Sequence, residues 1–293
     1  IGDLHHANQT PQRASQAYSA SLRLAQELGQ QVVPAFGNAL RRAQERMAGY
    51  SNAYADYIDA QIPADERSSR FDRSIDILLG RKQIFLQEPL KFYFPGLPQI
   101  QFYERDDFDW IANVEAHTDD IARELEAVMA EDGSFKPYVE RNETQPHVRE
   151  SEMVGNEDWS AFYLWRDGQP VAENTARCPV TTEVMRNVPL DHLPGQAPSV
   201  LFSLLKPGAR IPVHRGLVNT RLICHLPLLV PGPAYLRVGN ETRQWTQGEM
   251  LIFDDSFEHE AWNEADETRV VLLFDVWRPE ITLEEREQIA RLI

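Results

Sequence analysis

The sequence predicts a mainly β core, an antiparallel sandwich or jelly roll, preceded by an α-helical N-terminal region. Short apolar runs broken by turns follow one another from Trp159 onward without helical segments between them, which is typical of such a core. Apolar residues at helical spacing fill the first part of the chain instead. A length of 293 residues accommodates one large domain with an appendage, or two modest domains.

Residues 1–66 are expected to form a helical N-terminal region. Apolar side chains recur at helical spacing over Ala14–Leu28, with Gly29 as a suitable end, and a second helical run covers Pro34–Ile58. Two such helices joined by a short turn are typical of a bundle or of the end of a helical-repeat module. This region is therefore a candidate contact for a protein partner.

Residues 67–158 are predicted to be a helical and loop region that supports the core. A short helix is expected over Phe71–Leu79 and a longer amphipathic helix over Asp107–Met129. Acidic sequence with Gly, Pro and Asn indicates loops over Asp132–Asp158.

Residues 159–293 are expected to form the β core. The segment Thr282-Leu283-Glu284-Glu285 is a capping box that opens a short terminal helix ending at Leu292. The strand-like runs are Ala161–Trp165, Ser199–Leu205, Arg221–Leu229, Ala234–Val238, Met250–Phe253 and Arg269–Val276.

The composition excludes several classes of protein. Asp and Glu number 45 against 29 Lys and Arg, and the net charge of −16 disfavours nucleic acids and anionic membrane surfaces as partners. Cys178 and Cys224 are too few for a disulfide framework or a thiolate metal cluster, although a single bridge between them is an alternative. The most apolar stretch, Leu222–Leu236, contains three prolines and is shorter than the roughly 20 residues of a membrane span. We therefore expect a cytoplasmic protein without an integral membrane segment.

Two histidines and an arginine are candidates for a site. If the polar turn after Trp262 joins two antiparallel strands about Glu264, His259 and Arg269 lie opposite each other with Cβ atoms roughly 5 Å apart. An imidazole beside a guanidinium is unfavourable in a core unless an anion or a metal-bound ligand lies between them. A dicarboxylate that chelates a metal near His259 and meets Arg269 at its far end would fit, with His214 as a second imidazole.

A glycine stands where a metal site of this kind usually has a carboxylate. The facial triad of oxygen-activating iron enzymes combines a His-X-Asp/Glu motif with a distant His, but His214-Arg215-Gly216 has glycine at the third position. A two-histidine site completed by water and the absence of a metal site therefore both stay open. His225 is another imidazole that could contact a ligand carboxylate.

An ordered set of motifs resembles the aspartyl/asparaginyl β-hydroxylases. The central block is Ile252-Phe253-Asp254-Asp255-Ser256-Phe257-Glu258-His259-Glu260, and the resemblance spans about residues 159–279. The accompanying residues, in order, are Asp158-Trp159-Ser160, Leu164-Trp165, Pro207-Gly208, His214, Gly216, Asn219, Arg221-Leu222, His225-Leu226, Asn240-Glu241-Thr242, Trp245, Trp262, Arg269 and Asp275-Val276-Trp277-Arg278-Pro279-Glu280.

The resemblance implies a cupin-like double-stranded β-helix that uses Fe(II), 2-oxoglutarate and O2 to hydroxylate a β-carbon. It implies that two histidines alone hold the metal, and these match His214 and His259. The glycine that replaces the usual carboxylate matches Gly216. The lack of a third protein ligand is therefore a feature of the family.

The same resemblance assigns the remaining site residues. Arg269 and Ser203 match the residues that bind the C5-carboxylate of 2-oxoglutarate, and His225 matches a histidine near the C1-carboxylate. Arg221 and Trp159 match positions near the substrate.

Two features stay open at this point. Asp255, four residues before His259, is expected to orient a ligand or water rather than to bind the metal, and the alternative is a solvated loop acid. Eukaryotic relatives carry a second arginine where this chain has Ile223. Either Arg210 or Arg215 replaces that cation, or the substrate differs.

Three functions are compatible with these residues. The first is hydroxylation of an unactivated C–H bond, at the β-carbon of an aspartyl or asparaginyl residue in a peptide or protein, or in a related small molecule. The second is hydroxylation of a lipid acyl chain, as in relatives that modify lipid A. The third is a jelly-roll binding module without catalysis.

Overall fold

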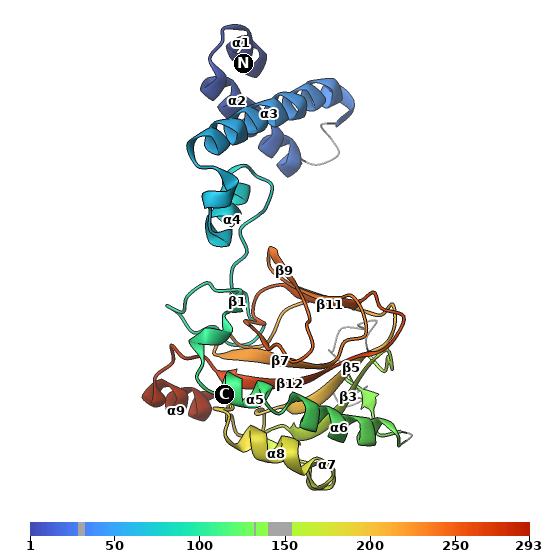
Figure 1. Cartoon of the computed structure of the whole chain (residues 1–293). Coiled ribbons are helices and arrows are strands. Elements are labelled where there is room, and N and C mark those ends of the chain that lie inside the picture. Colours follow the sequence, from blue (N-terminus) through green and yellow to red (C-terminus); the bar gives the residue numbers. More distant parts are fainter. Residues whose placement is uncertain (29–32, 132, 140–153) are drawn as a thin grey trace. The chain divides into compact units, whose positions relative to one another are not determined.

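A computed structural model describes residues 1–28, 33–131, 133–139 and 154–293, and its contacts divide the chain into two compact units (Figure 1). The first unit comprises residues 1–84 and the second residues 85–293. Residues 67–84 therefore group with the N-terminal helices, and the rest of the expected support region groups with the sheets. The helix end at Gly29 and most of the predicted loop over residues 132–158 lie outside the described residues.

The first unit is helical, as the sequence predicts. A small apolar core of Ala14, Tyr18 and Ala43 joins the two long helices, and the Tyr18 hydroxyl donates a hydrogen bond to Asp3 (2.7 Å). The Ser68 hydroxyl caps the last helix by accepting from the Phe71 N–H. The elements are α1 (Gly2–Ala7), α2 (Pro11–Leu28), α3 (Val33–Gln61), the 3₁₀ helix η2 (Ala64–Glu66) and α4 (Ser69–Leu78).

The second unit contains two antiparallel sheets that form the predicted jelly roll. The large sheet has the order β1-β10-β7-β12-β5-β3-β2, with β4 paired to β3, and the small sheet has the order β6-β11-β8-β9. The large-sheet strands are β1 (Phe102–Tyr103), β2 (Lys136–Pro137), β3 (Trp159–Arg166), β4 (Gln169–Pro170), β5 (Val200–Leu205), β7 (Arg221–Leu229), β10 (Leu251–Phe253) and β12 (Arg269–Trp277). The small-sheet strands are β6 (Arg210–His214), β8 (Ala234–Val238), β9 (Glu241–Gln244) and β11 (His259–Asn263).

Helices cover the face of the large sheet that points away from the small sheet (Figure 1). Apolar residues of α6, such as Ile121 and Leu125, pack with Phe202 and Leu272 of this face in one buried cluster. The free thiols Cys178 and Cys224 are buried there as well, so the alternative of a bridge between them is wrong. The helices of this unit are η3 (Arg105–Asp107), α5 (Ile111–Glu115), α6 (Thr118–Met129), α7 (Ala172–Arg177), α8 (Pro179–Arg186) and α9 (Leu283–Leu292).

Most predicted elements are confirmed, and two differences have local causes. The capping box of Thr282 and Glu285 opens α9, and all six predicted strands are present. The single helix predicted over Asp107–Met129 is wrong, because the chain turns between α5 and α6, where the Thr118 hydroxyl donates to the Glu115 carbonyl (2.7 Å). Polar strands such as β9 were not predicted, since they lack an apolar alternation. No helix in the described ranges is long and apolar enough to cross a bilayer.

Candidate active site

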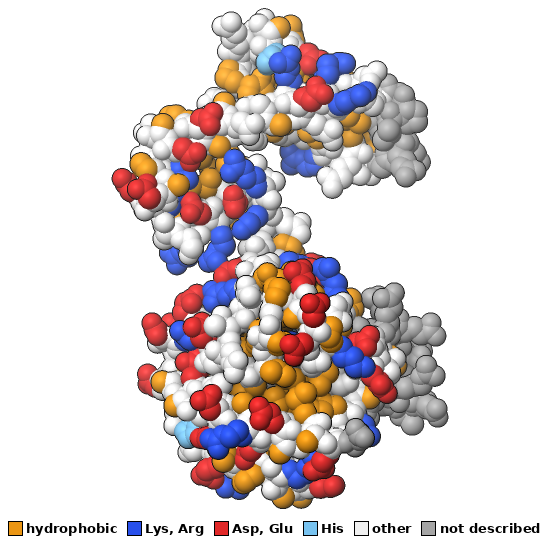
Figure 2. Space-filling model, turned by 45° about the vertical axis from the view of Figure 1, so that its right-hand side comes forward, with side chains coloured by type: hydrophobic (Ala, Val, Ile, Leu, Met, Phe, Trp, Pro, Cys, Tyr) orange, Lys and Arg blue, Asp and Glu red, His pale blue; other side chains and the backbone are white. Residues whose placement is uncertain are grey.

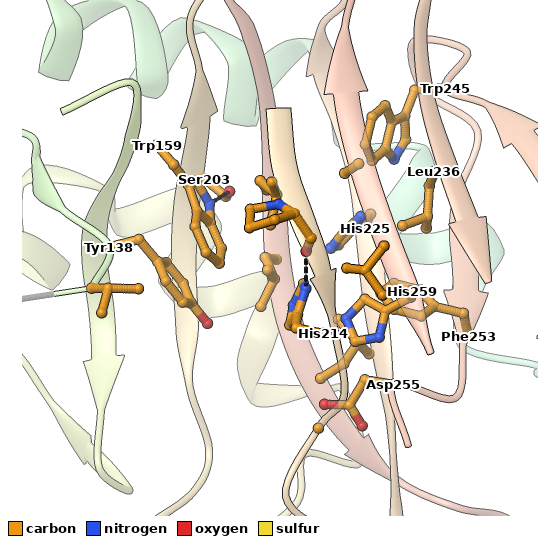
Figure 3. Close-up of a pocket in the computed structure, with 18 of the residues that line it drawn as sticks. Tyr138, Trp159, Ser203, His214, His225, Leu236, Trp245, Phe253, Asp255 and His259 are labelled. Atoms are coloured by element: carbon orange, nitrogen blue, oxygen red, sulfur yellow. Dashed lines mark hydrogen bonds between the residues drawn. The ribbon is translucent and has the colours of Figure 1, made fainter. Parts of the chain in front are cut away.

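A cavity of about 400 Å³ lies between the two sheets and collects the residues that the sequence singled out. Figure 3 shows Trp159 and Tyr138 on one side of it and Trp245 and Phe253 on the other. All eight predicted site residues line this cavity: Trp159, Ser203, His214, Arg221, His225, Asp255, His259 and Arg269.

His214 and His259 lie side by side on neighbouring strands of the small sheet (Figure 3). They are paired across β6 and β11, and their ring centroids are 4.0 Å apart. Each Nδ1 donates a hydrogen bond to a backbone carbonyl two residues earlier, at 2.8 Å for His214 and 2.9 Å for His259. This arrangement fixes the tautomer and leaves both Nε2 lone pairs available to one metal ion.

Burial keeps the second imidazole neutral. Desolvation first, and then the neighbouring His214, lowers the pKa of His259 to about 3, so the ring can act as a ligand at neutral pH without losing a proton. No cluster of three or more His, Cys, Asp or Glu side chains suited to a metal occurs among the residues that the structure describes. Imidazole nitrogen is a ligand for several transition metals, iron among them, so this pair could hold such an ion with its remaining positions open.

The side chain of Asp255 explains the glycine in the histidine motif. A Cβ atom on Gly216 would lie 2.2 Å from the Asp255 Oδ2 atom, so any larger residue at this position requires the carboxylate to move. The Gly216 N–H also donates to the Asp255 carbonyl (2.6 Å). The Asp255 carboxylate therefore occupies the space of a side chain at position 216. Its buried Oδ1 has no partner in the described part of the chain, which suits the expected role of orienting water or a ligand.

Arg269 reaches the cavity from the opposite sheet, and the predicted pairing of His259 with Arg269 is wrong. Arg269 is paired with Leu205 on β5, whereas His259 is paired with His214 and Val238. The connection crosses from one sheet to the other instead of forming a hairpin. The Asn263 amide stabilises this crossing by donating to three backbone carbonyls, among them that of Leu205 (3.1 Å).

The Arg269 guanidinium is a buried cation without a carboxylate partner among the described residues. Its side chain is 1% exposed, and it packs over the Trp245 ring at 4.4 Å. The guanidinium donates a hydrogen bond to the Ser203 carbonyl (3.2 Å), and its Nε has no partner in the part of the chain that the structure describes. Burial lowers the pKa of Arg269 to about 9, so the group is still charged at neutral pH. An anion bound here would neutralise it.

Ser203 and His225 extend this anion site. The Ser203 hydroxyl accepts from the Trp159 indole N–H (3.2 Å), so its own proton is available to a ligand oxygen. Burial, and then the neighbouring Arg269 and His259, hold the pKa of His225 well below its usual range. Its ring is therefore neutral, and Nδ1 has no partner among the described atoms.

Arg221 differs from Arg269 because two carboxylates compensate its charge. Its guanidinium contacts Asp275 at 2.7 Å and Asp255 at 3.5 Å. Burial lowers its pKa, but these carboxylates more than offset that effect and raise it overall. Beside it, Tyr138 stacks on Trp159 with ring centroids 3.9 Å apart and forms an aromatic wall.

Neither candidate for the missing second cation reaches the cavity. Arg210 is paired with Glu260, and Arg215 is paired with Glu88 (2.9 Å) and Glu258 (3.5 Å). Neither arginine is among the lining residues, whereas Ile223 is. The proposal that Arg210 or Arg215 replaces the cation is therefore wrong, and the site contains an apolar side chain at that position.

An extended segment over residues 85–98, here called the strap, connects the loop that follows His214 to the loop that precedes His259. Its backbone N–H groups donate to Ser256 (from Glu88, 2.9 Å) and to Gly216 (from Leu90, 3.0 Å). The buried Gln87 amide donates to Asp254 (2.8 Å) and accepts from the Asn219 amide (3.0 Å).

Sequence reasoning missed the strap, and it also missed Tyr138 and Trp245 as residues of the site. Each of these is separated by many residues from the motif that it supports. Asn219 and Trp245 belong to the ordered set of family motifs, which was the one available signal.

Comparison with known proteins decides the family. A family model described as aspartyl/asparaginyl β-hydroxylase matches residues 115–279, more than half of the chain. The chain belongs to this family. The aspartyl/asparaginyl β-hydroxylase of Homo sapiens is 36% identical over 133 residues, which cover 45% of this chain and 17% of that protein.

Other relatives differ in their named activities. The ornithine lipid ester-linked acyl 2-hydroxylase of Rhizobium tropici is 33% identical over 193 residues, covering 65% of this chain and 64% of that protein. An aspartate β-hydroxylase domain-containing protein 2 of Xenopus tropicalis is 31% identical over 208 residues, covering 70% of this chain and 54% of that protein. The chain thus spans less than two thirds of the length of each of these three relatives.

The solved structures that match are cupin domains. A cupin domain of Schizosaccharomyces pombe has a TM-score of 0.30 and 10% identity, covering 45% of this chain and 72% of that one. A cupin 2 conserved barrel domain protein of Salinispora arenicola has a TM-score of 0.28 and 12% identity, covering 47% and 87% respectively. At these values the matches carry no argument of their own, and the strand order defines the fold.

Proposed function

We propose that this protein is an Fe(II)- and 2-oxoglutarate-dependent dioxygenase that hydroxylates an unactivated C–H bond. The observation that carries the proposal is the uncompensated Arg269 guanidinium in the same cavity as the His214–His259 pair. A cation at one end and two free imidazole nitrogens at the other match a co-substrate with a carboxylate at one end and a chelating 2-oxo acid at the other.

Each residue has a definite task in this proposal. The Nε2 atoms of His214 and His259 would hold the iron, which supplies the activation of O2 when bound. Arg269 and the Ser203 hydroxyl would bind the far carboxylate and so present the chelating end in one orientation. The neutral His225 would donate to the near carboxylate.

Three further residues would control water at the site. Asp255 would orient a water in an open coordination position, because its buried Oδ1 has no partner within the described residues. Tyr138 and Trp159 stack on each other and line the cavity, where they would exclude water from the reacting atoms.

Succinate formation tests the proposal. With Fe(II), ascorbate and O2, we expect the protein to convert 2-oxoglutarate to succinate and CO2, even at the slow rate without a prime substrate. His259→Ala should abolish this conversion, since one imidazole cannot replace the pair. Turnover by a metal-replete His259→Ala sample would refute the ligand assignment, and no turnover by the metal-replete wild-type protein would favour a binding module.

Two substrate classes are compatible with this chemistry. The β-carbon of an aspartyl or asparaginyl residue is the class in the name of the family. A lipid acyl chain is the class in the name of the Rhizobium tropici relative, and the apolar Ile223 in the cavity favours it.

A further inference from the structure

We propose that Trp245 binds the far carboxylate of the co-substrate through its indole N–H group, as a third donor beside Arg269 and the Ser203 hydroxyl. This inference rests on the proposed function and adds a binding residue to the same cavity. Three observations support it: the indole N–H has no acceptor, the ring lies beside the uncompensated guanidinium, and this end of the cavity is closed to solvent.

The Trp245 side chain is buried with its one polar atom unpaired. It is 1% exposed, and Nε1 has no hydrogen-bond partner among the described residues. The backbone of the same residue is fixed, because its N–H donates to the Ala234 carbonyl (3.1 Å). Buried tryptophans usually have a partner for the indole N–H, since an unpaired buried donor destabilises the folded state. An indole nitrogen can only donate, so the missing partner is an acceptor that binds in the cavity, which Trp245 lines.

Two other tryptophans show how an indole N–H is satisfied in this unit. The Trp159 N–H donates to the Ser203 hydroxyl (3.2 Å), and the Trp262 N–H donates to the Glu264 carboxylate (2.9 Å). Trp159 lines the cavity but is already paired, and Trp262 is not among the residues that line the cavity. Trp245 therefore combines a position in the cavity wall with a free donor.

The Trp245 ring lies beside the guanidinium to which the proposed function assigns the far carboxylate. The Arg269 guanidinium carbon is 4.4 Å from the centroid of this ring. The cation lies over the ring face, whereas the N–H bond lies in the ring plane, so this bond does not point at the cation. Figure 3 shows the nitrogen-bearing edge of Trp245 turned toward Leu236 and His225, which line the same cavity. A carboxylate that binds Arg269 from the cavity would meet this N–H as well.

This end of the cavity is closed to solvent, and the opposite is true near Val213 and Leu217. Trp245 and Arg269 are each 1% exposed, whereas Val213 and Leu217 line the cavity and are about half exposed. The surface of this unit is mixed, with hydrophobic side chains gathered between acidic and basic ones on one face (Figure 2). A carboxylate at the closed end gives up its water, so protein donors have to replace it.

No carboxylate among the described residues competes for this position. Asp255 is the one acidic side chain that lines the cavity, and it contacts Arg221 (3.5 Å) instead. A carboxylate has enough lone pairs to accept from Arg269, Ser203 and Trp245 together. Hydrogen bonds of this kind are strengthened by the charge of the acceptor, and a third one would hold the diacid more firmly in one orientation.

A pair of 2-oxo acids isolates the effect on the far carboxylate. 2-Oxoglutarate carries this group, and 2-oxopentanoate has the same chelating end but a methyl group in its place. The dissociation constant of each is measured by calorimetry on the full chain with Mn(II) and without O2. We expect Trp245→Phe, which keeps an aromatic ring beside Arg269, to weaken the binding of 2-oxoglutarate about tenfold and to leave that of 2-oxopentanoate unchanged.

Trp262→Phe is the matched control. It removes an indole N–H that is paired with Glu264 away from the cavity, so both dissociation constants should stay unchanged. A loss of equal size for both ligands in Trp245→Phe would show that the ring only supports the fold. Unchanged affinity for 2-oxoglutarate in this variant would equally refute the proposal.

A second measurement needs no variant. In the unaltered protein, isotope-labelled at its tryptophans, the Trp245 indole signal is identified by its proximity to the Arg269 side chain. We expect its proton resonance to move downfield when 2-oxoglutarate binds with Zn(II), because the N–H gains a charged acceptor, and to stay in place with 2-oxopentanoate. A signal that stays in place while 2-oxoglutarate binds would refute the proposal even if Trp245→Phe does not fold.

The outcomes separate this inference from the proposed function. If wild type forms succinate and Trp245→Phe binds 2-oxoglutarate equally well, the role of Trp245 is wrong and the dioxygenase assignment stands. If the two ligands behave as expected but no succinate forms with Fe(II), the role of Trp245 holds and the dioxygenase assignment fails. If wild type with metal binds neither 2-oxo acid, both fail.

Discussion

Replacing Arg269 with methionine should stabilise the protein without ligand and abolish its response to 2-oxoglutarate. Burial lowers the pKa of this guanidinium from 12.5 to about 9, which corresponds to about 5 kcal/mol of desolvation at about 1.36 kcal/mol for each pH unit. Methionine avoids that cost but loses the packing over Trp245, about 1–2 kcal/mol, and the bond to Ser203, about 1 kcal/mol. We therefore expect Arg269→Met to raise the free energy of unfolding by about 2 kcal/mol.

Urea denaturation with and without ligand measures both effects. Manganese with 2-oxoglutarate at about a hundred times its dissociation constant should stabilise the wild-type protein by about 2.7 kcal/mol and the variant hardly at all. The control is Arg278→Met, since Arg278 is equally buried but pairs with Asp254 (2.6 Å). Its loss leaves the buried Asp254 carboxylate without its counter-ion and should destabilise the protein by about 3–5 kcal/mol. An Arg269→Met protein that is less stable than wild type and still responds to 2-oxoglutarate would refute the reasoning.

Three further predictions concern pH, metal affinity and sterics. Burial, and then the charge of Asp275, raises the pKa of Asp191 to about 8. The folded state therefore favours the protonated carboxyl, and the stability that this preference contributes is fully present below about pH 4 and is lost as the pH rises through 8. At pH 8, the free energy of unfolding of Asp191→Asn, measured in urea, should be about 1–3 kcal/mol higher than that of wild type. A variant whose stability depends on pH in the same way as wild type would contradict this. Gln87→Leu removes the hydrogen bond to Asp254 and should weaken cobalt binding of the folded protein about tenfold in calorimetry. The control Gln288→Leu, at an exposed residue of α9, should leave the cobalt affinity unchanged. Equal affinities of the two variants would limit Gln87 to a structural role. Gly216→Ala should displace the Asp255 carboxylate and reduce succinate formation at least about tenfold, and retained turnover would show that this carboxylate can move freely.

The candidate site could be predicted because its residues lie in short, ordered motifs. His259 lies in a nine-residue block, and the residues matched to it through the family line one cavity in the structure. Their chemical roles stay predictions. The hairpin about Glu264 was wrong because side-chain bonding by Asn263 carries the chain to the other sheet, and strand periodicity contains no information on such a crossing.

Other parts of the fold depend on contacts that local patterns do not contain. The break between α5 and α6 follows from a hydroxyl bond of Thr118, in a segment whose apolar period continues through the break. Strand β6 has one buried residue, Ile211, and owes its place to pairing with β11. The strap contacts loops more than 100 residues away, for example from Gln87 to Asp254.

The strap also shows where a minimal catalytic fragment has to begin. The family match begins at residue 115, but residues 85–98 hold together the loops that follow His214 and precede His259. A fragment cut at residue 115 would leave the fully buried Asp254 without the amide of Gln87, and Asn219 without its backbone partners at Phe94. Shortening this protein for crystallography or engineering should therefore respect the boundary at residue 85, thirty residues before the start of the family match.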